Sequence, residues 1–116
     1  MSAELYRCPP AGRKLGSAAD AVELIGAAAG SGAGWIVIPA ERLRDEFFDL
    51  KTRVAGEFLQ KFAQYGARVA FVGDTAARVG ASQAWRAFVA ECDRGASVRF
   101  AASEAELEER LQRRHG

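Results

Sequence analysis

The sequence is poor in histidine and cysteine, and its net charge is close to zero. The single histidine, His115, stands beside the last residue, so histidine-dependent catalysis and histidine-ligated metal sites have almost nothing to use. Two cysteines, Cys8 and Cys92, are too few for a disulfide framework or a cysteine-rich metal cluster. The net charge of +1 argues against bulk electrostatic binding to nucleic acid or to an anionic membrane. We therefore expect no metal and no cofactor.

The sequence also lacks a long apolar run. No run approaches the roughly 20 apolar residues that span a bilayer, so we expect no association with a membrane. The first residues, Met1 to Glu4, place an acidic side chain where a signal peptide needs basic and then apolar residues. We therefore expect a cytoplasmic protein in which both cysteines are reduced thiols.

What the sequence does contain is enough apolar material for a packed core. Its 116 residues are 49% hydrophobic, which rules out wholesale disorder and fits one domain spanning residues 1–116. Four short apolar runs, bounded by Gly or Pro, are typical of strands that are buried on both faces. These expected strands are Leu5–Cys8, Trp35–Ile38, Arg68–Val72 and Ser97–Ala101.

The first helix signal follows the first expected strand. Ser17 is a good N-cap with Asp20 three residues later, and the apolar stripe that follows runs into the glycine-rich loop 30–34. A dinucleotide-binding loop would need such glycines after a strand and before a helix. Here the glycines follow a helix and precede a strand, so we interpret the loop as a helix end.

Three further helix signals complete the pattern. A second apolar stripe begins at Val54 and stops at Gly66. A third helix begins at Ser82, and a fourth begins at Ser103 with Glu106 as its capping-box partner. The alternation of strands and helices predicts a small α/β sandwich, with a four- or five-stranded, mostly parallel sheet and about four helices.

Two places in this expected fold carry side chains suited to binding. At the start of the second helix, Lys51 and Thr52 stand beside free backbone N–H groups that favour an anion, including a phosphate placed on Thr52. The alternative, which we favour from the residues alone, is that Thr52 is a plain N-cap. After the third strand, Asp74 could hold a metal ion or a hydroxyl group, although its place next to Gly73 favours a turn.

The segment from residue 47 to residue 62 reads FFDLKTRVAGEFLQKF, which resembles the signature of a bacterial family called domain of unknown function 4180. The family pattern is F-F-D-L-[KR]-[ST]-G-x-A-G-E-x-x-Q-K-F, followed by a strand that ends in V-G-D. The chain continues in agreement with V-G-D at residues 72–74, and it has D-R-G at residues 93–95 where the family has N-R-G. The similarity extends from residue 5 to residue 111 and implies no established activity.

More distantly, the layout resembles the sulfate-transporter and anti-sigma-factor-antagonist (STAS) domains. In the antagonists, a partner kinase phosphorylates a hydroxyl group at the start of a helix, and this switches binding. By position, Thr52 would be that phosphoacceptor. The chain departs from the antagonist motif at two points: Asp49 stands three residues before Thr52 instead of two, and Arg53 replaces a glycine of both family patterns.

The first functional hypothesis is a non-enzymatic regulatory or protein-interaction domain of STAS-like type. The resemblance implies an unknown protein partner that contacts the start of the second helix, around Lys51, Thr52, Arg53 and Glu57. A sheet of four or five strands also leaves its edges open, which makes a homodimer plausible.

Two other hypotheses use overlapping residues. A domain that binds a small molecule or an anion would use Lys51 and Thr52 together with Asp74. An enzyme would use Asp49, Glu57 or Asp74 as an acid or a base, but no nucleophile or set of metal ligands stands beside them in the sequence. We therefore expect a protein that is not an enzyme.

Overall fold

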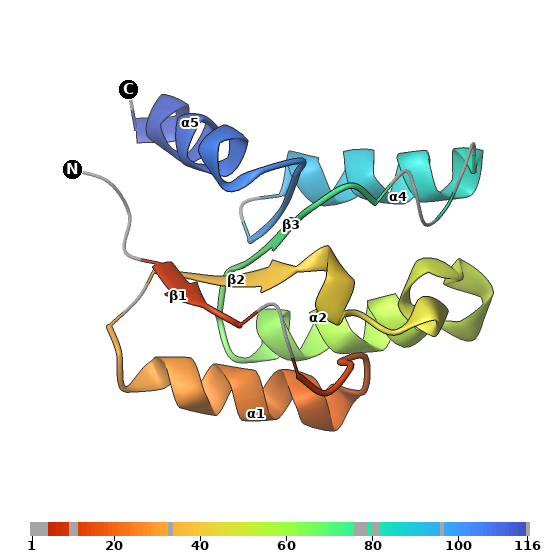
Figure 1. Ribbon diagram of the computed structural model, residues 1–116, viewed down its shortest axis with the longest axis horizontal. Helices are drawn as coiled ribbons and strands as arrows, with labels where there is room; N and C mark the ends of the chain where they lie inside the picture. The colour runs from red at the N-terminus through yellow and green to blue at the C-terminus, as the bar shows by residue number, and fades with distance from the viewer. Residues whose placement is uncertain are drawn as a thin grey trace.

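Four strands form one sheet in the order β1-β2-β3-β4, and every neighbouring pair is parallel. The computed structural model describes residues 5–9, 12–32, 34–75, 79, 82–95 and 97–115, with side chains up to residue 111. This sheet confirms the predicted α/β class and the expected parallel strands (Figure 1). The strands are β1 (Leu5–Arg7), β2 (Trp35–Pro39), β3 (Val69–Val72) and β4 (Val98–Ala101).

Helices cover both faces of the sheet. Each crossover steps to the next strand in the same direction, and right-handed crossovers of this kind place their helices on one face. That face packs against α1, α2 and α4, whereas α5 packs against the opposite face through Leu107 and Leu111. Within the described ranges, the α-helices are α1 (Ala18–Ala29), α2 (Val54–Gln64), α4 (Gln83–Arg94) and α5 (Glu104–His115). None of the helices in the described ranges is both long and apolar enough to cross a membrane.

The central strands are buried on both faces, as their apolar runs predict. Ile36 and Ile38 of β2 belong to the core under α1, α2 and α4, while Trp35 and Val37 belong to the core under α5. Aromatic rings fill much of the larger core, and Phe71 stacks on a ring of β4 with 4.9 Å between ring centroids. Phe47, Phe58 and Phe62 are also fully buried in this larger core.

The helix starts follow the predicted caps. The Ser17 hydroxyl accepts from the N–H of Asp20, and the Asp20 carboxylate accepts from the N–H of Ser17, which makes a complete capping box. The hydroxyl of Ser82 accepts from the N–H of Trp85 at the start of α4. These local bonds fix where α1 and α4 begin.

Two arginines close the outer edge of β4. The carbonyl groups of residues 97 and 101 accept hydrogen bonds from the N–H groups of Val69, in β3, and Gly73, directly after it. The carbonyls of Val98 and Phe100 therefore point away from the sheet. Arg99 donates to the first of these outer carbonyls and Arg110 to the second, each at 2.7 Å. A second sheet could pair with β4 only by breaking both hydrogen bonds.

Candidate functional site at the carboxyl edge of the sheet

The structure places five of the six predicted site residues on one continuous segment between β2 and the first turn of α2. This segment, residues 49–57, is called the docking segment below. It begins in a short 3-10 helix, Leu50–Thr52, and continues into α2. The five predicted residues are all exposed: Asp49, Lys51, Thr52, Arg53 and Glu57.

Hydrogen bonds within the chain hold the docking segment in shape. The Thr52 hydroxyl lies 2.7 Å from the carbonyl oxygens of both Glu46 and Asp49, to which it donates, and it accepts from the N–H of Val54 at 3.2 Å. The Asp49 carboxylate accepts from the N–H of Lys51 at 3.1 Å. Thr52 therefore has a structural role, although its side chain remains exposed to solvent.

Arg53 has a left-handed backbone conformation, with φ of 63° and ψ of 7°. Among the described residues it is the only non-glycine residue with positive φ. It is also the N-cap of α2, so the predicted N-cap at Thr52 is wrong by one position. The chain turns through Arg53 before the helix begins, and such a conformation costs a residue with a Cβ about 1 kcal/mol.

Asp74, the sixth predicted residue, lies in a different part of the edge. It follows β3 and Gly73, whose φ is 137° and whose missing Cβ would lie 3.0 Å from the Cβ of Ala40. Asp74 lines a cavity of about 250 Å³ together with Glu106 and other residues near β4. Among the described residues, neither Lys51 nor Thr52 lines this cavity. The structure therefore does not join Asp74 with Lys51 and Thr52 in one cavity.

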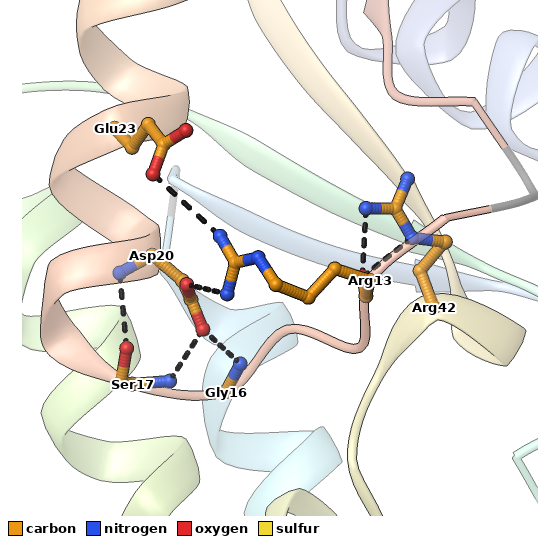
Figure 2. Close-up of polar contacts among 6 residues, drawn as sticks. All are labelled: Arg13, Gly16, Ser17, Asp20, Glu23 and Arg42. Atoms are coloured by element: carbon orange, nitrogen blue, oxygen red, sulfur yellow. Dashed lines mark hydrogen bonds and ion pairs between the residues drawn. The ribbon is translucent and has the colours of Figure 1, made fainter.

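A second cluster of polar residues surrounds Asp20, whose exposed fraction is 4%. The Asp20 carboxylate is the centre of this cluster. It accepts from the backbone N–H groups of Gly16 and Ser17 at 3.0 and 3.1 Å, and from Nη1 of Arg13 at 2.6 Å. Figure 2 shows the Arg13 side chain between Asp20 and Glu23, whose carboxylate lies 3.6 Å from Nη2. Burial alone would raise the pKa of Asp20, but the hydrogen bonds from Arg13, Ser17 and Gly16 outweigh burial and lower the pKa to about 2.

Arg42 holds the other side of the same loop and is also buried, with an exposed fraction of 9%. Its Nε and Nη2 both donate to the carbonyl oxygen of Arg13, at 2.9 and 2.8 Å (Figure 2). Its Nη1 donates to the carbonyl oxygen of Pro9 at 2.7 Å and to Sγ of Cys8 at 3.4 Å. Arg42 and Asp20 together hold the described residues between β1 and α1, which are 8–9 and 12–17, and this region is called the β1–α1 corner below.

The β1–α1 corner borders a cavity of about 340 Å³, called the corner cavity below. Polar side chains from Arg42 and Asp20 share its walls with apolar ones. The lining residues are Tyr6, Cys8, Pro9, Arg13, Leu15, Asp20, Glu23, Leu24, Ala27 and Arg42. The sequence predicted Asp20 only as a helix-capping residue, and it gave no reason to connect Arg42 with a loop about thirty residues earlier.

The two cysteines lie in different surroundings. Cys8 is buried in the β1–α1 corner, as expected for a cysteine in a strand that packs like a small apolar residue. Burial raises the pKa of the Cys92 thiol to about 11, and the charges of Asp93 and Glu91 add to this effect. At neutral pH, Cys92 is therefore a protonated and weakly nucleophilic thiol. Within the described ranges, no group of three or more His, Cys, Asp or Glu side chains could hold a metal ion.

The fold and this edge define a class of protein: a small α/β domain with an all-parallel sheet and polar loops at the carboxyl ends of its strands. The family described as Domain of unknown function (DUF4180) matches residues 2–111, so the chain belongs to this family, as its residue pattern predicted. No curated protein and no solved structure gives a significant match to the chain.

Proposed function

We propose that the chain is a cytoplasmic, non-enzymatic regulatory or protein-interaction domain that contacts a protein partner through the docking segment. The observation that carries this proposal is the conformation of Arg53. This residue keeps a left-handed backbone in an exposed, charged segment, although glycine would adopt it at lower cost. Backbone strain of this kind concentrates at binding sites, where the position of a side chain matters more than local stability.

Phosphorylation of Thr52 is the proposed switch. A phosphate group on Thr52 would stand between Lys51 and Arg53, near the positive end of the α2 dipole. It would also remove the hydroxyl hydrogen that binds the carbonyl oxygens of Glu46 and Asp49, so the shape of the docking segment would change with its charge. The distant resemblance to STAS domains supports the same residue.

The other two hypotheses have weaker support. Binding of an anion by Lys51 and Thr52 together with Asp74 requires groups that line different parts of the sheet edge. Catalytic acids and bases are commonly shielded from solvent, whereas Asp49, Glu57 and Asp74 are all exposed. Both hypotheses would regain support if the docking segment proved unnecessary for association with a partner.

Association of the full chain with a co-purified partner tests the proposal. We expect Thr52→Asp to change the dissociation constant at least about tenfold, because it places a negative charge at the proposed switch. Gln64→Asp, at the exposed far end of the same helix, is the matched control and should leave the constant unchanged. A charge reversal at both Lys51 and Arg53 tests whether the docking segment is the surface that contacts the partner.

Two outcomes would contradict the proposal. Unchanged binding by Thr52→Asp would remove the switch, and unchanged binding by the Lys51 and Arg53 double reversal would remove the docking segment as the contact surface. Light scattering of the same samples measures whether the partner is a second copy of the chain. A mass equal to one copy would show that the partner is not a second copy of the chain.

A further inference from the structure

The corner cavity lies beside β1, at the edge of the sheet. Its walls come from β1 and the described residues that follow it, from the side of α1 that runs from Asp20 to Ala27, and from Arg42, which follows β2. A volume of about 340 Å³ is within the range of cavities that hold small molecules. The volume therefore suits a metabolite-sized ligand.

The walls of the corner cavity are held rigidly before any ligand arrives. Asp20 accepts three hydrogen bonds from the β1–α1 corner, and Arg42 donates to two carbonyl groups and one sulfur atom of the same loop. Both side chains are at least nine-tenths buried. A site built in this way loses little conformational entropy when it binds.

Arg42 determines the charge that such a ligand should carry. Asp20 and Glu23 both form ion pairs with Arg13, but no carboxylate of the described residues lies within ion-pair distance of Arg42. Among the described residues, the groups that contact its guanidinium are the carbonyl oxygens of Pro9 and Arg13 and Sγ of Cys8. One N–H of Nη2 has no partner among the described residues, so Arg42 can still donate to a ligand. A buried positive charge without a counter-ion favours an anion.

The other lining residues indicate that the rest of the ligand should be apolar. Leu15, Leu24 and Ala27 present apolar surface, and the ring of Tyr6 adds to it. A ligand with an apolar body would therefore be covered on that side. We propose that the corner cavity is a binding site for a small organic carboxylate, whose carboxylate group contacts Arg42 and whose apolar body lies against Leu15 and Leu24.

The test uses defined probes and leaves the loop contacts intact. Butanoate, hexanoate and phenylacetate are compared with their neutral amides and with inorganic phosphate, by thermal shift and by backbone amide NMR of the full chain. We expect at least one carboxylate to raise the melting temperature and to shift the amide signals of the β1–α1 corner. The matching amide and inorganic phosphate should bind at least about tenfold more weakly, because the amide lacks the charge and phosphate lacks the apolar body.

A pair of variants on α1 tests the location. Ala27 lines the corner cavity and is exposed, so Ala27→Phe adds bulk at the cavity wall without replacing a buried core residue. Ala29 is exposed on the same helix and does not line the cavity, so Ala29→Phe is the matched control. We expect Ala27→Phe to weaken carboxylate binding at least about tenfold and Ala29→Phe to leave it unchanged. Arg42 is not substituted, because its loss would release the loop.

Several results would overturn the proposal. Equal binding of a carboxylate and its amide would remove the role of Arg42, and equal binding of phosphate would remove the organic ligand class. Signal shifts confined to α4, which borders a separate cavity of about 330 Å³, would place the ligand elsewhere. Failure of every carboxylate to bind would also contradict the proposal, whether or not the docking segment binds a partner.

Discussion

The β1–α1 corner and the docking segment are polar loops at the same edge of the sheet, but they hold their charges in opposite ways. In the corner, the charged groups of Asp20 and Arg42 are buried, and backbone atoms of the loop occupy most of their hydrogen-bonding capacity. In the docking segment, Lys51, Arg53 and Glu57 remain exposed, and hydrogen bonds of Thr52 and Asp49 hold the backbone. Similar residue types therefore serve two different purposes.

Because the charges are buried in one loop and exposed in the other, we expect the β1–α1 corner to affect stability and the docking segment to affect recognition of a partner. When a substitution removes a buried polar group, its hydrogen-bond partners are left unsatisfied, so substitutions in the corner should lower the stability of the fold. An exposed charge loses little when it is removed, so substitutions in the docking segment should affect association with a partner and leave the fold nearly unchanged. Each prediction below tests whether the two loops differ in this way.

Removal of the Asp20 carboxylate should have the largest effect. Asp20→Ala leaves the N–H groups of Gly16 and Ser17 without their acceptor and removes the main partner of Arg13. We expect the free energy of unfolding to fall by about 3 kcal/mol. Asp49→Ala, in the docking segment, loses one exposed hydrogen bond and should cost less than about 1 kcal/mol. Urea denaturation at neutral pH measures both values.

Glu23→Ala is the control within the corner. Glu23 is exposed and lies 3.6 Å from Arg13, so its removal should change the free energy of unfolding by less than about 0.5 kcal/mol. Equal losses for Asp20→Ala and Asp49→Ala would contradict the contrast between the two loops.

The second prediction concerns acid, and it again separates the corner from the rest of the surface. The pKa of Asp20 is lowered to about 2 in the folded chain, from a usual value of 3.8. A carboxyl group with a lowered pKa stabilises the fold above its unfolded pKa and loses this effect as the pH falls through the folded pKa. We therefore expect about 2 kcal/mol of stability to disappear between about pH 4 and pH 2.

Denaturation of the wild type and of Asp20→Asn between pH 4 and pH 2 isolates the contribution of the Asp20 charge to the free energy of unfolding. The asparagine variant cannot ionise, so the difference in stability between the two chains should shrink as the pH falls from 4 to 2. A difference that stays constant over this range would show that the charge of Asp20 does not stabilise the fold.

The fold could be predicted from the sequence because its signals are local. Apolar runs such as Trp35–Ile38, and caps such as Ser17 and Ser82, act over a few residues. Parallel order then follows from the alternation of strands and helices. Five candidate residues lie together in the structure because the docking segment is continuous in sequence.

The β1–α1 corner could not be predicted in the same way. Arg42 reaches the carbonyl groups of Pro9 and Arg13 across about thirty residues, and a single arginine in a polar stretch has no periodicity to reveal it. The position of the α2 N-cap was missed for a different reason. Threonine at residue 52 is a good cap, but its hydroxyl donates backwards to Glu46 and Asp49, and the helix begins after Arg53.

The last prediction is smaller than those for Asp20, has the opposite sign and concerns Arg53. Glycine adopts a φ of 63° without a steric cost, so Arg53→Gly should raise the free energy of unfolding by about 0.5–1 kcal/mol and the melting temperature by a few degrees. Lys51→Gly is the matched control, because Lys51 lies in the 3-10 helix, where glycine should lower stability. If the docking segment serves recognition, Arg53→Gly should also weaken association with the partner, since it removes a charge from the contact surface. A variant that is more stable and binds equally well would mean that the left-handed residue does not serve the proposed contact, and the contrast with the β1–α1 corner would then rest on burial alone.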